Sequence, residues 1–155
     1  MLRTKSRLAL CLCMICVNLA FIWGNSLLTG ETSGEISGQV QEILEPLLAE
    51  VTDEPETAHS LVRKTAHFIE FGTLGMLLSW LFAMLQKKPW QRLVFPLLCG
   101  VAAACVDETI QCFVPDRGPG LKDVGIDTLG VILGIVIIYF IRKRKNSKYL
   151  EEQTL

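Results

Sequence analysis

The sequence predicts an all-α membrane protein with four transmembrane helices and an amphipathic outer segment between the first and the second. Three observations support this fold class. Half of the 155 residues are hydrophobic, and the mean hydropathy is +0.39. The hydrophobic residues gather in four blocks whose lengths approach the roughly 20 helical residues that cross a bilayer. Clusters of basic residues flank these blocks in an order that four spans place on one side of the membrane.

The four blocks define the expected helices. They all belong to a single domain of residues 1–155, and the spans cover about residues 8–24, 64–85, 93–113 and 123–141. Basic clusters precede the first span, separate the second from the third, and open the C-terminal tail at residues 142–155. Gly130 and Gly134 in the last span have the small-x3-small spacing that permits close helix packing.

The basic clusters also predict the orientation. The positive-inside rule assigns their side to the cytoplasm. We therefore expect a multi-pass protein of the cell membrane with both termini cytoplasmic and with residues 24–62 and 114–123 outside. The first block resembles a signal peptide in its charged and apolar regions, but the following sequence FIWGNS lacks a small-x-small cleavage site, so we interpret it as a retained anchor.

The acidic segment 31–56 predicts short amphipathic helices. Thr32 and Glu35 have the spacing of a capping box. Apolar residues then recur at intervals of three and four, and Pro46 should divide the helix because it lacks a backbone donor. We expect this segment to lie on the outer membrane surface or over the bundle.

The six cysteines all fall within the expected spans. We interpret them as small apolar packing residues. Cys13 and Cys16 have the spacing of half a zinc or redox motif, but no second pair accompanies them. The cysteines therefore indicate neither a disulfide framework nor a metal centre.

Ionisable side chains from three spans fall at a common depth. Counting about 20 helical residues from each cytoplasmic edge places six of them at the outer boundary or up to about 8 Å inside it: His67, Glu70, Asp107, Glu108, Asp123 and Asp127. A charge at the centre of a bilayer costs about 2.5–3.5 kcal/mol, and less near the interface. Such groups should therefore face the interior of the bundle and pair with one another.

Helical spacing groups these residues further. Arg63, His67 and Glu70 follow at i, i+4 and i+7, which places them on one stripe of the second span. Asp107 and Gln111 are four residues apart in the third span, so their side chains lie on one face.

The loop between the third and fourth spans is rich in glycine and proline, as a tight turn requires. We expect it to return Arg117 and Lys122 over the cluster. Basic and acidic groups are then nearly balanced. This favours an internally paired network whose centre accepts a polar or zwitterionic group.

Two segments resemble one known family. The sequences RKTAHFIEFGTLG (63–75) and DETIQCFVPDRGPGLKDVGIDTLG (107–130), together with four spans, resemble the VanZ-like family over about residues 8–141. The resemblance implies a small bacterial membrane protein, in a family with one member associated with low-level resistance to the glycopeptide teicoplanin. Phe71 departs from the pattern, because the family often has Tyr at that position. The residues at the family's characteristic positions are Arg63, Lys64, His67, Phe68, Glu70, Asp107, Glu108, Gln111, Arg117, Asp123 and Asp127.

The resulting functional hypothesis is a charged cavity in the outer leaflet that binds a polar cell-envelope ligand without a cofactor. The ligand would be a lipid head group, a wall precursor or a glycopeptide, with membrane lipid as a partner and no nucleic acid. Basic groups would contact its phosphate or carboxylate. The expected ligand-binding residues are Arg63, Lys64, His67, Glu70, Asp107, Glu108, Gln111, Arg117, Asp123 and Asp127.

The alternative is a hydrolase or transferase that acts on a lipid-linked substrate, by acid/base chemistry or with a divalent metal. Its catalytic residues would be His67, Glu70, Asp107 and Glu108. A Mn²⁺ or Zn²⁺ site would use the same four residues and Asp127, although Arg63 and Arg117 would compete for the carboxylates. The nearby hydroxyls of Thr65, Thr73 and Thr109 show no nucleophile spacing. A third interpretation is a charge network that only joins the helices.

Overall fold

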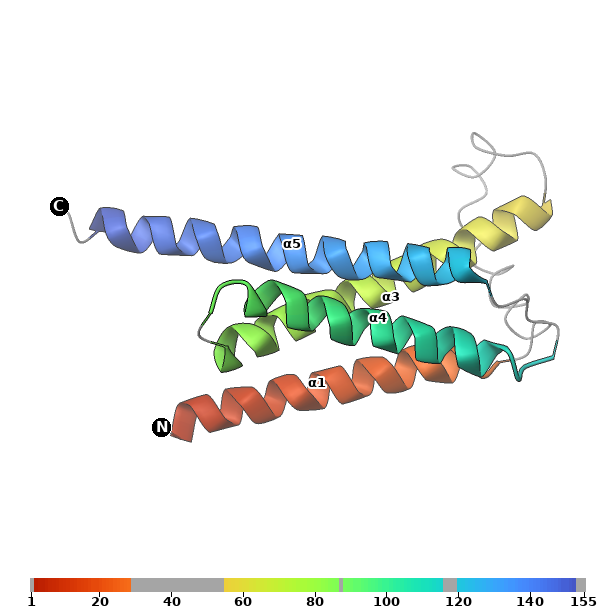
Figure 1. Cartoon of the computed structure of the whole chain (residues 1–155), viewed down its shortest axis with the longest axis horizontal. Coiled ribbons are helices and arrows are strands. Elements are labelled where there is room, and N and C mark those ends of the chain that lie inside the picture. The colour runs from red at the N-terminus through yellow and green to blue at the C-terminus, as the bar shows by residue number, and fades with distance from the viewer. Residues whose placement is uncertain (1, 29–54, 87, 116–119, 153–155) are drawn as a thin grey trace.

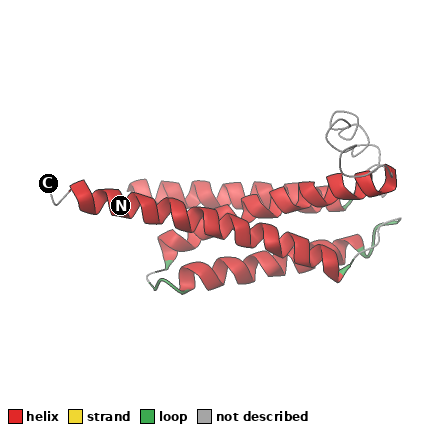
Figure 2. Cartoon of the chain, turned by 90° about the horizontal axis from the view of Figure 1, so that it is seen from above, coloured by secondary structure: helices red, strands yellow, loops and turns green. Residues whose placement is uncertain are grey.

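The structure, a computed structural model, describes residues 2–28, 55–86, 88–115 and 120–152. The described chain forms four helices and no strand: α1 (Leu2–Ser26), α3 (Pro55–Leu85), α4 (Gln91–Gln111) and α5 (Leu121–Glu152). The helices run side by side in alternating directions, so α1 begins and α5 ends at the same end of the bundle (Figure 1). A view turned by 90° shows the same elongated bundle (Figure 2). The predicted fold class is confirmed.

Each helix contains a segment that is long and apolar enough to cross a membrane. These segments are Lys5–Ser26, Ser60–Leu85, Gln91–Gln111 and Leu121–Lys145. They agree with the expected spans to within a few residues. Helices α3 and α5 extend further than these segments, because a helix need not end where its apolar block ends. Residues 31–54 of the expected amphipathic segment lie outside the described residues, so that prediction stays open.

The interior of the bundle is apolar through most of its length. Phe71, Leu74, Ile22 and Val131 are at most 1% exposed and belong to one hydrophobic cluster to which all four helices contribute. Large apolar side chains also cover the outside of every helix, as in Val17, which is 64% exposed. An apolar exterior around a bundle with spans of this length is the surface that lipid requires.

Helices α3 and α5 pack with their backbones in contact. A Cβ atom added at Gly134 would collide with the Gly72 carbonyl oxygen and the Met76 backbone nitrogen, and one added at Gly130 would collide with the Phe68 carbonyl oxygen. The predicted close packing at the two glycines of the last span is therefore confirmed. Because Gly130 lies against the turn of α3 that begins at His67, this contact brings the first turns of α5 beside the polar stripe of α3.

Candidate functional site

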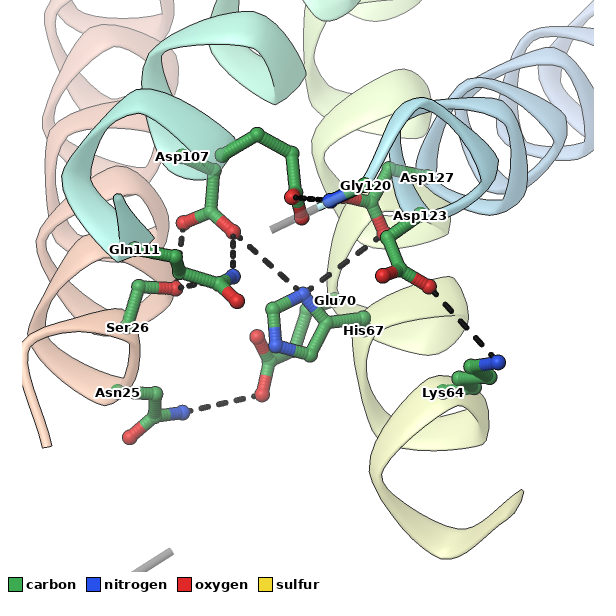
Figure 3. A network of polar contacts seen from close by, with 11 residues as sticks. Asn25, Ser26, Lys64, His67, Glu70, Asp107, Gln111, Gly120, Asp123 and Asp127 are labelled. Atoms are coloured by element: carbon green, nitrogen blue, oxygen red, sulfur yellow. Dashed lines mark hydrogen bonds and ion pairs between the residues drawn. The ribbon is translucent and has the colours of Figure 1, made fainter. Parts of the chain in front are cut away.

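Polar side chains from all four helices meet at the end of the bundle opposite the two chain ends (Figures 1 and 3). Because the helices alternate in direction, the last turns of α1 and α4 lie beside the first half of α3 and the first turns of α5. Asn25 and Ser26 reach the cluster from α1, His67 from α3, Asp107 from α4 and Asp127 from α5 (Figure 3).

Asp107 is the most completely bonded member of the cluster. The residue has no exposed surface. Its Oδ1 accepts a hydrogen bond of 2.7 Å from Ser26 Oγ, and its Oδ2 accepts one of 2.9 Å from Gln111 Nε2. Gln111 Nε2 also lies 3.3 Å from Ser26 Oγ. Two neutral donors, one from α1 and one from the next turn of α4, therefore fix the orientation of this carboxylate.

His67 lies between two buried aspartates (Figure 3). Its Nδ1 is 3.6 Å from Asp107 Oδ2 and 3.7 Å from Asp127 Oδ1. Both separations exceed the 2.7–3.2 Å typical of an N–H···O hydrogen bond. The imidazole side chain is 13% exposed and stacks on Phe71, with the ring centroids 6.4 Å apart. The aromatic ring on its inner side therefore limits the directions in which His67 can turn.

Asp127 contrasts with Asp107. It is 1% exposed, yet its Oδ2 has no hydrogen-bond partner among the residues that the structure describes. One donor atom from each of His67, Asp107 and Asp127 lies within 4.8 Å of the other two. The centre of the cluster thus combines one well-bonded carboxylate, one carboxylate with an unbonded oxygen, and an imidazole.

Two contacts join α5 to its neighbours around this centre. Glu108 Oε2 accepts a 2.8 Å hydrogen bond from the Gly120 backbone N–H, just before α5 begins. Lys64 Nζ lies 3.9 Å from Asp123 Oδ1, with 40% of the lysine side chain exposed. A surface ion pair of this length contributes little to stability.

A third contact joins α1 to α3. Asn25 Nδ2 donates a 3.0 Å hydrogen bond to Glu70 Oε1. The other carboxylate oxygen, Glu70 Oε2, is buried without a hydrogen-bond partner in the described part of the chain. Glu70 thus interacts with α1 instead of joining the group formed by His67, Asp107 and Asp127.

A small cavity opens within the cluster. Its volume of about 10 Å³ holds one water molecule or one ion. Residues of α3, α4 and α5 form its walls, and they include side chains of both charges. The lining residues are Arg63, Lys64, His67, Glu108, Gln111, Asp123, Ile126 and Asp127.

Most of the residues that the sequence predicts to bind a ligand are found in the wall of this cavity. Asp107 lies directly behind His67, and Glu70 lies toward α1. Arg117 falls outside the described residues. Within the described chain Arg63 forms no ion pair with Asp107 or Asp127, whereas the expected competition by Arg117 lies outside the described residues.

Sequence reasoning missed the contribution of α1. Asn25 and Ser26 donate hydrogen bonds to Glu70 and Asp107. Neither of these two residues, which lie in the sequence GNS at the end of the first span, is among the predicted site residues. The sequence does contain a signal for this contribution, because the two polar residues Asn25 and Ser26 end the first apolar span on the side where the second span begins.

Three of the hydroxyl groups near the cluster already donate hydrogen bonds. Thr73 and Thr109 donate to backbone carbonyls four residues earlier, at 3.0 and 2.7 Å. Ser26 donates to Asp107, whereas a serine nucleophile gives its proton to an imidazole. These three hydroxyls therefore offer no activated nucleophile of the Ser–His–Asp type.

Comparison with known proteins gives one family. The sequence profile of the VanZ/LLP1 family matches residues 8–142, nearly the whole chain. The uncharacterised protein C11E3.10 of Schizosaccharomyces pombe is 28% identical over 85 residues, which cover 55% of this chain and 51% of that protein. The chain thus spans about half the length of the curated relative that it matches. No solved structure matches significantly. With its four membrane-spanning helices and this match, the chain belongs to the VanZ/LLP1 family.

Proposed function

We propose that this membrane protein binds the polar head group of a cell-envelope lipid or wall precursor at the cavity, in the outer leaflet of the cell membrane. One observation carries the proposal: a cavity at the end of the bundle is lined by two cations and several carboxylates from three helices. Polar groups are costly in a membrane interior and are commonly functional there.

The charges suggest how such a ligand would be held. Arg63 and Lys64 line the cavity without a close ion pair to the buried centre, so they are available to a phosphate or carboxylate. Glu108 and Asp123 accept hydrogen bonds from hydroxyl or amino groups. Because the cavity volume is only about 10 Å³, a single group of the ligand enters it and the rest lies outside the helices.

The orientation follows from the basic clusters. With both termini in the cytoplasm, the cavity faces the outer surface, where glycopeptides act on wall precursors. A contribution to teicoplanin resistance then follows if the protein binds the precursor or the glycopeptide there, as the resemblance to the VanZ-like family implies.

The test is binding of a polyprenyl phosphate to the purified protein in nanodiscs, followed by native mass spectrometry. Arg63→Gln and Lys64→Gln should each weaken binding by about tenfold, which corresponds to one charged hydrogen bond. Lys88→Gln is the matched control, since Lys88 is exposed at the opposite end of the bundle.

Equal weakening by the Lys88 control would attribute binding to general charge attraction and overturn the proposal, as would no binding to the wild type. Cells that express the wild type should tolerate more teicoplanin than cells that express Arg63→Gln. Equal susceptibility would remove the glycopeptide from the proposal and leave the lipid.

A second function is favoured by the position of His67 between two aspartates. An imidazole beside carboxylates suits acid/base chemistry or metal-assisted hydrolysis or transfer on a lipid-linked substrate. Incubation of the reconstituted protein with a lipid-linked wall precursor separates the two functions. A product that disappears in His67→Ala would establish the enzyme, whereas an unchanged precursor would favour the binding function.

A further inference from the structure

We propose that His67, Asp107 and Asp127 together coordinate a divalent transition-metal cation, with Zn²⁺ bound more tightly than Mn²⁺. This site requires no organic ligand, so it goes beyond the proposed head-group binding. It draws one side chain from each of α3, α4 and α5 (Figure 3), and two of the three, His67 and Asp127, line the cavity.

The donor atoms of the three residues lie close to the spacing of metal ligands. Ligand atoms about 2.1 Å from a metal lie roughly 3.0–3.4 Å from their neighbours in tetrahedral or octahedral sites. The Nδ1 atom of His67 lies 3.6 and 3.7 Å from the two aspartate oxygens, and all three donor atoms lie within 4.8 Å of one another. These separations are too long for direct hydrogen bonds. Contraction by a few tenths of an ångström would bring His67 to metal-ligand spacing from each aspartate, and the two aspartate oxygens would close on the same ion from a separation of at most 4.8 Å.

Asp127 has an unbonded oxygen at the cavity. This residue is 1% exposed and lines the cavity, but its Oδ2 has no partner in the described chain. A buried carboxylate without a compensating charge or hydrogen bond is strongly unfavourable. Neither the lysine nor the arginine that lines the cavity supplies this charge, since Lys64 lies beside Asp123 and Arg63 forms no ion pair within the described chain. A divalent cation at the cavity would supply it.

Residues behind two of the three ligands restrain their orientation. Metal-ligating side chains are commonly oriented by hydrogen bonds from residues that do not touch the metal. Ser26 and Gln111 do this for Asp107, at 2.7 and 2.9 Å, and Phe71 lies against the imidazole of His67. The cavity adds room for one water molecule as a fourth ligand.

The structure also narrows the ligand set. Glu70 and Glu108, which the sequence placed in an alternative metal site, lie outside the group of donor atoms within 4.8 Å of one another, and each is bonded elsewhere. Glu70 accepts from Asn25 and Glu108 accepts from the Gly120 N–H. A mixed set of one nitrogen and two carboxylate oxygens suits Zn²⁺ and Mn²⁺, and at a given site affinity rises from Mn²⁺ to Zn²⁺.

The experiment is a metal titration of the purified full chain in detergent after treatment with a chelator, using calorimetry with ZnCl₂ or MnCl₂ and no added lipid. We expect a single Zn²⁺ per chain. Asp127→Asn should weaken Zn²⁺ binding by about tenfold or more. Asp123→Asn is the matched control, because Asp123 lines the same cavity one turn away and lies outside the ligand set.

Equal affinities of Asp127→Asn and Asp123→Asn, or a wild type that binds no metal, would overturn the site. X-ray absorption of the zinc-loaded wild type tests the site without any variant. The spectrum should show scattering from an imidazole ligand, and a spectrum without it would also overturn the proposed site. The Arg63→Gln variant should bind the polyprenyl phosphate about tenfold more weakly but keep Zn²⁺, so the metal site and the head-group site can each fail without the other.

Discussion

At the residue scale, two aspartates with nearly equal burial have different surroundings. Asp107 has three polar neighbours on its two oxygens, two of which are strong neutral donors, whereas Asp127 keeps one oxygen unbonded. The sequence placed both at a similar depth and could not distinguish them. The difference arises because Ser26, from a helix more than 80 positions away, reaches one carboxylate and not the other.

Removing the Ser26 hydroxyl should therefore destabilise the fold. In Ser26→Ala the buried Asp107 Oδ1 loses its 2.7 Å hydrogen bond, and a buried charged acceptor without its donor costs about 1–3 kcal/mol. Thermal unfolding in detergent measures the loss. Ser6→Ala on the exposed face of the same helix is the control. If both variants unfold at the wild-type temperature, the bond contributes nothing.

At the element scale, the contact between α3 and α5 determines the geometry of the site. Gly72 on α3 and the two glycines Gly130 and Gly134 on α5 let the backbones touch. Small residues allow this approach, which adds the packing contacts that hold helices together in lipid. Asp127 lies one turn before Gly130, so the distance between the helices also sets the distance between Asp127 and His67.

Two glycine substitutions on α5 test this contact, because one should lower the stability of the fold and the other should not. Gly134→Ala places a methyl group against the backbone of α3, and overpacking of this kind costs about 1–3 kcal/mol. Gly125→Ala meets no atom within 4 Å and should be neutral or stabilising, because alanine has the higher helix propensity. If the melting temperatures of Gly134→Ala and Gly125→Ala fell equally, or if neither fell, the contact between α3 and α5 would not stabilise the bundle. Gly134→Ala should also weaken Zn²⁺ binding.

At the scale of the whole molecule, the alternating helices put the polar cluster at one end and both chain ends at the other (Figure 1). The connection between α3 and α4 shares the end with the termini. Basic residues concentrate at that end, which is the arrangement that the positive-inside rule associates with the cytoplasm.

Reporter fusions test this orientation. Green fluorescent protein fused after Leu155 should fluoresce, because it folds in the cytoplasm. Alkaline phosphatase fused after Pro115 should be active outside, whereas a fusion after Lys88 should be inactive. The reverse pattern would place the cluster on the cytoplasmic side and would remove the outer leaflet from the proposed function.

The number of helices, their approximate bounds and the common depth of the ionisable residues were determined by the sequence alone. Hydrophobicity and charge are local properties of each span, so they can be counted without knowing its neighbours. The spacing of residues within one helix also predicts which side chains share a face, as the hydrogen bond between Gln111 and Asp107, four residues apart, shows.

The tertiary structure decided how each helix is rotated and which partner each polar group meets. It turned Glu70 toward Asn25, brought Ser26 to Asp107, and left His67 between two aspartates. Rotation depends on contacts summed over a whole helix interface, including the backbone approach at Gly130. Those contacts join residues far apart in the chain, so no single span carries the information.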